Sequence, residues 1–166
     1  IVEEQKYPDG NFPTCPYPIP EIFEALRLGL ELAEKTGADL MLATDPDADR
    51  TGVTIKSASG EYITLTGNQI GALLVDYIIK GHKEAGTLKQ NSAAIRSVVS
   101  SPLFDAICKS QGVTPMCVLT GFKYIGEKIK AFREDLDMNQ TELGKMVNMT
   151  QRKISYIECG KYEPSI

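Results

Sequence analysis

Residues 44–52 read TDPDADRTG and place three carboxylates at alternate positions, with an arginine directly after the last of them. Like charges this close repel one another, so Asp45, Asp47 and Asp49 need a cation or a set of donors to hold them together. Mg²⁺ prefers a compact set of oxygen ligands, usually a few carboxylates and a phosphate oxygen. Arg50 can hold phosphate or sugar oxygens in its planar fork. The stretch therefore indicates a magnesium site that serves phosphoryl transfer.

Three other interpretations compete for the same acidic stretch. Asp and Pro are common in solvated turns, so a plain turn is one alternative. An EF-hand calcium loop that starts at Asp45 needs Gly at its sixth position and Glu at its twelfth, where the sequence has Arg50 and Lys56, and it is excluded. An aspartyl-phosphate phosphatase has DxDx[TV] after a strand, and its first Asp attacks phosphorus. Asp49 occupies the Thr/Val position of that pattern, so the phosphatase stays a weaker alternative beside the turn.

Alternating helices and strands surround the acidic stretch. Apolar residues at helical spacing predict a first helix that stops at Gly37: Ile22, Leu26, Leu30 and Ala33. The short apolar run 40–43 is long enough for a buried strand that ends at the acidic stretch. Residues 53–57 and 61–65 predict two strands that return around Ser59-Gly60.

The second half of the chain continues this alternation before its pattern changes. A second helix is expected from Asn68, a linker over residues 81–92, and strands at 94–100 and 115–120 on either side of a helix at 102–112. Helix and strand thus alternate over the first 120 residues. The sequence predicts the α/β class, with partial domains of mixed sheets and flanking helices, followed by a small all-α segment.

Two long segments carry a family resemblance. ADLMLATDPDADRTGV, followed by GEYITLTGNQIGALLVDYI, resembles the second domain of the α-D-phosphohexomutases, the phosphoglucomutase/phosphomannomutase family. IRSVVSSPLFDAICKSQGV and VLTGFKYIGEKI extend the resemblance into the opening of that family's third domain. The resemblance covers residues 1–130. It implies an active-site phosphoserine that exchanges phosphate with a hexose phosphate, such as glucose or mannose phosphate, through a bisphosphorylated intermediate.

The resemblance also implies roles for particular residues. The aspartates 45, 47 and 49 would bind Mg²⁺ together with the phosphoserine oxygen, and Arg50 would act as the catalytic residue beside the transferring phosphate. Gly121, Phe122 and Lys123 would form the substrate-binding loop that meets the sugar phosphate. Nothing like the family's TASHNP phosphoserine loop, its GEES-like sugar loop or its fourth-domain phosphate loop occurs in the sequence. We therefore expect no turnover of glucose 1-phosphate by the chain alone.

The last forty residues predict three short helices. Asn139 can cap a helix with Glu142 as its capping-box partner, and Asn148 suits a tight left-handed turn. Thr150 can then cap a third helix whose inward residues are Ile154 and Ile157. Two short helices joined by a three- or four-residue turn form a helix-turn-helix. Ile129, Phe132 and Leu136 are expected on one face of the preceding helix.

The pattern NQTELGKMVNMTQRKISYIECGKYEPS resembles the repressor/Cro-type DNA-binding domain, apart from Gly144 where Ala is typical and Asn148 where Gly is typical. By that resemblance, the third helix enters the major groove of DNA. The candidate DNA contacts are Gln151, Arg152 and Tyr156 at base edges, with Gln140 and Lys161 near phosphates. The alternative is a helical hairpin with a polar outer face, and the equal numbers of acidic and basic residues in 125–166 favour it.

These signals divide the chain into three expected parts: 1–86 from the mutase second domain, 87–128 from the third, and 129–166 as the helix-turn-helix. IGEKIK, residues 125–130, satisfies both family patterns, so the junction is compatible with a genuine fusion, a sequence-assembly error or a degraded gene. Three functions stay open: a mutase fragment with the Mg²⁺ loop, a DNA-binding regulator whose α/β region senses a sugar phosphate, and a chimera with no function of its own.

Composition narrows the cellular setting. Hydrophobic residues make up 42% of the chain and charged residues 24%, which is ordinary for a globular protein. No apolar run reaches membrane-spanning length, so no membrane partner is expected. Four scattered cysteines and a single histidine do not favour a zinc site. Reduced thiols and a cytoplasmic location are expected instead.

Overall fold

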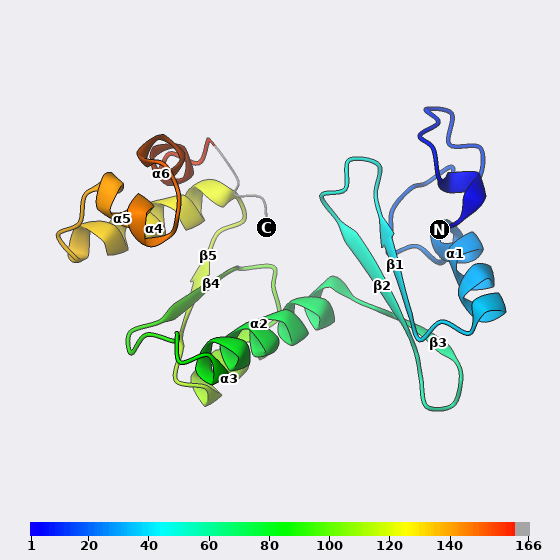
Figure 1. Cartoon of the computed structure of the whole chain (residues 1–166), viewed down its shortest axis with the longest axis horizontal. Coiled ribbons are helices and arrows are strands. Elements are labelled where there is room, and N and C mark those ends of the chain that lie inside the picture. Colours follow the sequence, from blue (N-terminus) through cyan, green and yellow to red (C-terminus); the bar gives the residue numbers. More distant parts are fainter. Residues whose placement is uncertain (162–166) are drawn as a thin grey trace. The chain divides into compact units, whose positions relative to one another are not determined.

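The computed structural model describes residues 1–161, so positions 162–166 of the expected helix-turn-helix segment lie outside the described residues. The chain forms two compact units, Ile1–Leu74 and Val75–Ile166, and each is described by itself (Figure 1). No helix within residues 1–161 is long and apolar enough to cross a bilayer.

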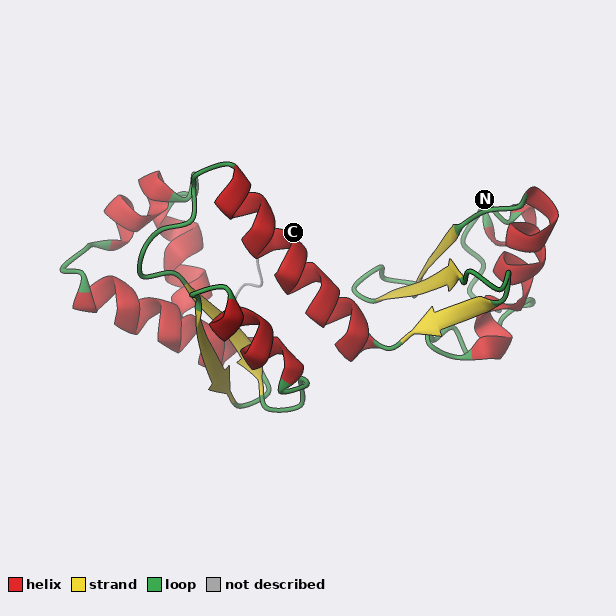
Figure 2. Cartoon of the chain, turned by 90° about the horizontal axis from the view of Figure 1, so that it is seen from below, coloured by secondary structure: helices red, strands yellow, loops and turns green. Residues whose placement is uncertain are grey.

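The first unit is a helix on a three-stranded antiparallel sheet. A short 3₁₀ helix, η1 (Glu3–Gln5), is followed by an irregular segment, residues 6–22, which we call the arm. The arm leads to α1 (Phe23–Thr36). The strands β1 (Leu40–Thr44), β2 (Thr51–Lys56) and β3 (Tyr62–Leu65) pair in that order, with Leu42 opposite Val53 and Ile55 opposite Ile63 (Figure 2). The predicted helix and all three predicted strands of this region are present, but the prediction that 40–43 is a buried strand is wrong, because Leu40 and Leu42 are 52% and 62% exposed.

One face of this sheet packs against α1 and the arm, and the other face is bare. Met41 contacts α1 at Gly29, and Thr54 is fully buried with its hydroxyl hydrogen-bonded to Thr64 at 3.0 Å. The alternate residues Leu40 and Leu42 are exposed on the opposite face. α1 stops where the sequence predicts, because Gly37 adopts the left-handed φ of 69° that a helix C-terminus favours.

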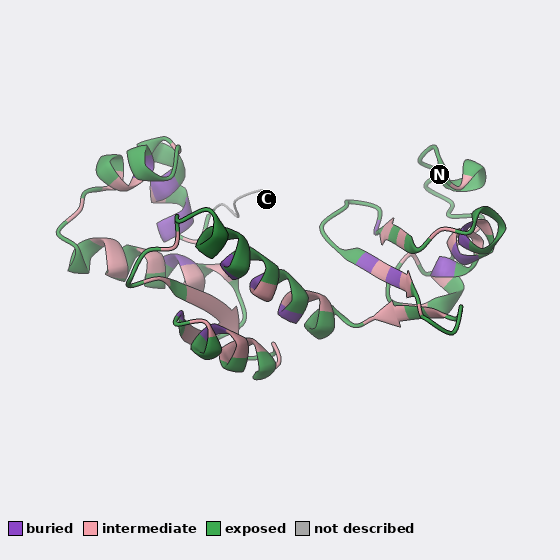
Figure 3. Ribbon diagram, turned by 60° about the horizontal axis from the view of Figure 1, so that its bottom comes forward, coloured by how far each residue is buried: buried purple, intermediate pink, exposed green. Residues whose placement is uncertain are grey.

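The second unit begins inside α2 (Gly67–Glu84), which packs with α3 (Leu103–Ser110) on the parallel strands β4 (Ala93–Ser97) and β5 (Thr114–Val118). A small apolar core joins these elements: Val75, Ile79, Cys108 and Val113. Figure 3 shows α2 with buried positions along one side and exposed positions along the other.

The predicted linker at residues 81–92 is partly wrong, because α2 continues through its first four residues. Gly81 is tolerated inside the helix, and its carbonyl accepts a hydrogen bond from Ala85 N–H at 3.0 Å. The helix ends only where Gly86 supplies a left-handed φ of 65°.

Three helices complete the second unit: α4 (Phe122–Asp135), α5 (Gln140–Met146) and α6 (Gln151–Glu158). α4 is one helix that carries both the end of the mutase-like pattern and the first helix of the repressor-like pattern. Within it, Ile129 and Phe132 are half-buried as expected, but Leu136 is 69% exposed. The expectation for Leu136 is wrong because α4 ends at Asp135, and the residue beyond the helix no longer follows its spacing.

The predicted caps and turn between α5 and α6 are confirmed. The Asn139 side chain accepts hydrogen bonds from the N–H groups of residues 141 and 142, and the Glu142 side chain accepts one from the Asn139 N–H at 2.7 Å. Thr150 caps α6, and Asn148 has a φ of 54°. The structure explains why position 144 has Gly where Ala is typical, since a Cβ there would lie 2.5 Å from the Met149 carbonyl oxygen.

Replacement of Asn139 by Ala should destabilise the second unit by about 1 kcal/mol, because two N–H groups of α5 lose their acceptor. Chemical denaturation monitored by circular dichroism measures this loss. The matched variant Asn139→Asp keeps a side-chain acceptor and should stay within a few tenths of a kcal/mol of the parent chain. Equal losses in the two variants would contradict the capping interaction.

Candidate functional site

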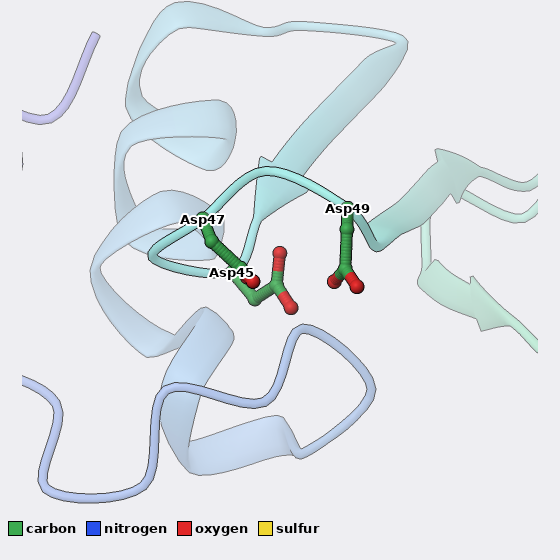
Figure 4. Close-up of side chains that lie close together, drawn as sticks. All are labelled: Asp45, Asp47 and Asp49. Carbon is green, nitrogen blue, oxygen red and sulfur yellow. The ribbon is translucent and has the colours of Figure 1, made fainter. Parts of the chain in front are cut away.

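The loop between β1 and β2 holds the three aspartates at one end of the hairpin. Asp45 directly follows β1, its N–H donates to the Arg50 carbonyl at 3.4 Å, and its own carbonyl accepts from Ala48. Ala48 adopts a left-handed φ of 57°, which tightens the turn. As a result, one carboxylate oxygen from each of Asp45, Asp47 and Asp49 lies within 4.8 Å of the other two, and the three side chains share one region of space (Figure 4).

The three carboxylates differ in exposure and in partners. Asp45 is buried, with 5% of its surface exposed, and its Oδ1 accepts a hydrogen bond from the Arg50 N–H at 3.1 Å. Asp47 and Asp49 are exposed. Arg50 Nε lies 3.2 Å from Asp45 Oδ2 and 3.5 Å from Asp49 Oδ1. The guanidinium is therefore shared by one buried carboxylate, Asp45, and one exposed carboxylate, Asp49.

The electrostatics of the loop separate Asp45 from Asp49. Burial acts to raise the pKa of Asp45, but the Arg50 N–H, the Asp49 carboxyl and the Arg50 charge together hold that pKa below its ordinary value. The pKa of Asp49 is raised, first by its hydrogen bond with Asp45 and then by the negative charge of Asp47. This pattern is that of carboxylates sharing one site, where a nearby cation makes full ionisation favourable.

The donor set suits a hard divalent cation. Three carboxylates on alternate residues offer oxygen ligands from one side and leave further positions for water or phosphate, which is the coordination Mg²⁺ favours. The phosphatase alternative requires Asp45 as an open nucleophile. Its burial and its hydrogen bond to the backbone disfavour that role.

The arm packs beside the acidic loop and the start of β2. A groove of about 930 Å³ lies between the arm, α1 and β1, and it extends to Asp45 and Pro46. Gly52 belongs to the second residue pair between β1 and β2, counted from the loop. It lies so close to Pro20 that a Cβ would overlap the Pro20 carbonyl oxygen. Only glycine allows this approach, so Gly52 fixes the arm against the base of the loop.

The predicted sugar-phosphate loop lies in the second unit, at the N-terminus of α4. Gly121 is the residue before the helix and adopts a φ of 125°, which favours glycine. Phe122 is half-buried, and Lys123 is exposed with its Nζ 4.7 Å from the centre of the Tyr124 ring. Lys123 is thus available to an anion, and its main chain is packed against Gly160 at the end of α6.

The structure brings four of the five predicted DNA contacts into two pairs. Gln151 Nε2 donates to Gln140 Oε1 at 2.5 Å, which joins the start of α6 to the start of α5. Arg152 stacks on the ring of Tyr156 and donates from Nε to its hydroxyl at 3.0 Å. Lys161 is exposed just beyond α6, and its N–H donates to the Tyr156 carbonyl.

A buried ion pair behind this face was not predicted. Arg133 Nε and Glu158 Oε1 lie 2.6 Å apart with side chains 10% and 1% exposed, and Glu158 also accepts from Gln140 at 2.9 Å. The hydrogen bonds from Arg133, then Gln140, hold the pKa of Glu158 below its ordinary value against the effect of burial. The available signal is that Glu158 follows Ile154 and Ile157 on the inward stripe of α6, where a charge requires a partner.

Comparison with known proteins places these residues in a family. Residues 1–60 match the family described as phosphoglucomutase/phosphomannomutase, alpha/beta/alpha domain II, and residues 66–138 match its alpha/beta/alpha domain III. Together the two matches extend over well more than half of the chain. The chain belongs to the phosphohexomutase family. Residues 129–166 also match a helix-turn-helix family, so the two patterns overlap on α4.

Curated relatives agree in sequence with the phosphohexomutase assignment. The chain is 38% identical over 138 residues to the phosphoglucomutases of Staphylococcus aureus strains USA300 and N315, a match that covers 83% of this chain and 24% of each relative. A crystal structure attributed to a phosphomannomutase from Thermus thermophilus is 22% identical, with a TM-score of 0.48 over 69% of this chain and 23% of that one. The chain thus spans about a quarter of the length of these curated relatives.

Replacement of Gly52 by Ala should destabilise the first unit by about 1–3 kcal/mol, because the new methyl group overlaps the Pro20 carbonyl and must push the arm away. Urea denaturation measures the change. Gly10→Ala is the matched control in the same arm, since nothing lies within 4 Å of its Cβ position. Equal stabilities of the two variants would show that the arm does not rest on the loop.

Proposed function

We propose that the loop of residues 45–50 binds Mg²⁺ as part of a phosphohexomutase site for intramolecular phosphoryl transfer on a hexose phosphate. The observation that carries this proposal is the convergence of the carboxylates of Asp45, Asp47 and Asp49 within 4.8 Å, in residues that match the family. A bound Mg²⁺ would supply charge neutralisation at the transferring phosphoryl group. The proposal concerns the binding of cation and phosphate by this chain, not complete turnover.

The residues of the acidic loop have different proposed roles. Asp45 anchors the loop, because its carboxylate is buried and tied to the backbone, while the exposed Asp47 and Asp49 can adjust to a ligand. Arg50 provides a planar donor group for phosphate oxygens. Gly121, Phe122 and Lys123 are proposed to meet the phosphate of the sugar, which is glucose or mannose phosphate. Their support is the exposed ammonium of Lys123 and the match to domain III.

A cytoplasmic location is consistent with this proposal. All four cysteines have free thiols in the structure, including the buried Cys108. Reduced thiols are typical of cytosolic proteins.

Mg²⁺ should stabilise the first unit against heat, and Asp47→Asn should abolish most of that stabilisation by removing one negative ligand. At a Mg²⁺ concentration ten times its dissociation constant, the expected gain is about 1.4 kcal/mol. Differential scanning calorimetry of the 166-residue chain with and without MgCl₂ measures it.

Asp39→Asn is the matched control, because it removes one exposed carboxylate next to β1 but outside the cluster. It should keep the full response to Mg²⁺. A response to Mg²⁺ that is equal in Asp47→Asn and in the parent chain would refute the metal site.

A second function, DNA binding by α6, is favoured by one specific observation. The exposed side chains of Gln151 and Arg152 are each held by a neighbour, Gln140 and Tyr156, so α6 presents an ordered polar face rather than a loose one. Gln and Arg are the side chains that most often read adenine and guanine in the major groove. With Lys161 near the phosphates, we propose a repressor/Cro-type contact with duplex DNA.

Loss of the Arg152 side chain should weaken binding to a duplex selected from a random library by about 1–3 kcal/mol. Fluorescence anisotropy over a range of KCl concentrations measures both the affinity and its salt dependence, which phosphate contacts require. Lys128→Ala is the matched control, because it removes one exposed positive charge from α4. Equal weakening in both variants would indicate charge attraction without a specific contact by α6.

A further inference from the structure

Arg50 contacts two of the three carboxylates that are proposed to bind the cation. Its Nε lies 3.2 Å from Asp45 Oδ2 and 3.5 Å from Asp49 Oδ1. These two residues also belong to the cluster whose carboxylate oxygens converge. The guanidinium therefore uses acceptor oxygens from the same donor set that a divalent cation requires.

A guanidinium and a divalent cation cannot both hold these oxygens at full strength. Each needs the lone pairs of the same carboxylates, and the two positive groups would repel each other at the short distances that the loop allows. Binding of one must weaken the hold of the other. Since the arginine is part of the loop, its local concentration is high and independent of the solution.

The geometry allows the side chain of Arg50 to leave without loosening Asp45. The Arg50 side chain is 65% exposed, so water can solvate its guanidinium when it leaves, whereas the Asp45 side chain that it contacts is only 3% exposed. The separate hydrogen bond from the Arg50 main-chain N–H to Asp45 Oδ1, at 3.1 Å, does not depend on where the guanidinium lies. The Arg50 main chain thus keeps the Asp45 carboxylate in place while a cation replaces the Arg50 guanidinium.

We infer that Arg50 is a tethered counter-ion that competes with the divalent cation for Asp45 and Asp49, and that cation binding releases its guanidinium to take a phosphate. This inference rests on the proposed magnesium site, and it adds that the cation binds before the guanidinium takes the phosphate. The released guanidinium belongs to the residue directly after Asp49, so it can bind an anion held beside the cation. Cation and phosphate then reinforce each other's binding.

The first test compares Mg²⁺ affinities by isothermal titration calorimetry on the 166-residue chain. Arg50→Gln should bind Mg²⁺ about two- to tenfold more tightly, because weak ion pairs no longer compete. Arg27→Gln is the matched control, since Arg27 is an exposed arginine of the same unit that pairs with Glu31. It should leave the Mg²⁺ affinity unchanged. Unchanged or weaker Mg²⁺ binding by Arg50→Gln overturns the inference.

The second test follows the side chain itself and does not require a variant to fold. The Nε–Hε signal of Arg50 in a proton–nitrogen NMR spectrum should shift and exchange faster with water as Mg²⁺ is added, while that of Arg27 stays in place. An Arg50 signal that is unaffected at saturating Mg²⁺ overturns the inference, because the guanidinium has then not moved.

The third test uses inorganic phosphate as the probe. Phosphate affinity should increase when Mg²⁺ is saturating, and the increase should be smaller in Arg50→Gln than in the parent chain. Suppose that the parent chain binds Mg²⁺ and Asp47→Asn does not. If Arg50→Gln then keeps the whole increase in phosphate affinity, the exchange of the guanidinium is refuted and the magnesium site stands. If the parent chain does not bind Mg²⁺ at all, the magnesium site and the exchange are both refuted.

Discussion

Repulsion among three carboxylates on one short loop is the constraint around which the first unit is organised. The antiparallel ladder of β1 and β2 fixes both ends of the loop, so Asp45 and Arg50 cannot separate. Burial of Asp45 beneath the arm would be unfavourable for an unpaired charge. The Arg50 main-chain N–H, 3.1 Å from Asp45 Oδ1, offsets that cost wherever the guanidinium lies, and the guanidinium adds a second contact that a bound cation can replace.

The second unit shows how two family patterns can share one helix. The matches to mutase domain III and to the helix-turn-helix overlap at residues 129–138, and in the structure both run through α4. α6 packs directly on the early part of α4, where a Cβ at Gly126 would overlap the Ile157 carbonyl oxygen. The glycine that the mutase-like motif TGFKYIG contributes is thus also the residue that lets the third helix approach. The helix-turn-helix is built onto the α/β region and is not a separate body on a linker.

Local signals made much of this fold predictable from sequence. The caps at Asn139 and Thr150 and the left-handed residues Gly37 and Asn148 act within a few positions of themselves, so a single stretch of sequence specifies them. The apolar run of β1 likewise predicts a strand, but it does not indicate an exposed face, because Leu40 and Leu42 are as apolar as Met41 between them. The acidic loop was predictable for the same reason, since three aspartates and an arginine in six residues are a local pattern.

The features that sequence did not predict depend on distant partners or on a close balance of local helix propensities. Pro20 approaches Gly52 across 32 positions of chain, and nothing near either residue indicates the contact. The continuation of α2 past Gly81 depends on the balance between one weak helix former and the residues after it. Glu158 lies on the inward stripe of α6, but that stripe does not indicate that its partner is Arg133, 25 residues earlier.

The two arginines that matter most show why burial, rather than residue type, decides what an ion pair does. Arg133 is 10% exposed and donates to Glu158 from two nitrogens and to the Met138 carbonyl from a third, so its removal would leave a buried carboxylate without its charge partner. Such a pair fixes the arrangement of α4, α5 and α6. Arg50 is 65% exposed, so its guanidinium can move into water, and a cation bound by Asp45 and Asp49 would replace its contacts. The same guanidinium group is therefore structural in one unit and exchangeable in the other, and an exchangeable cation is what a site for Mg²⁺ and phosphate can use.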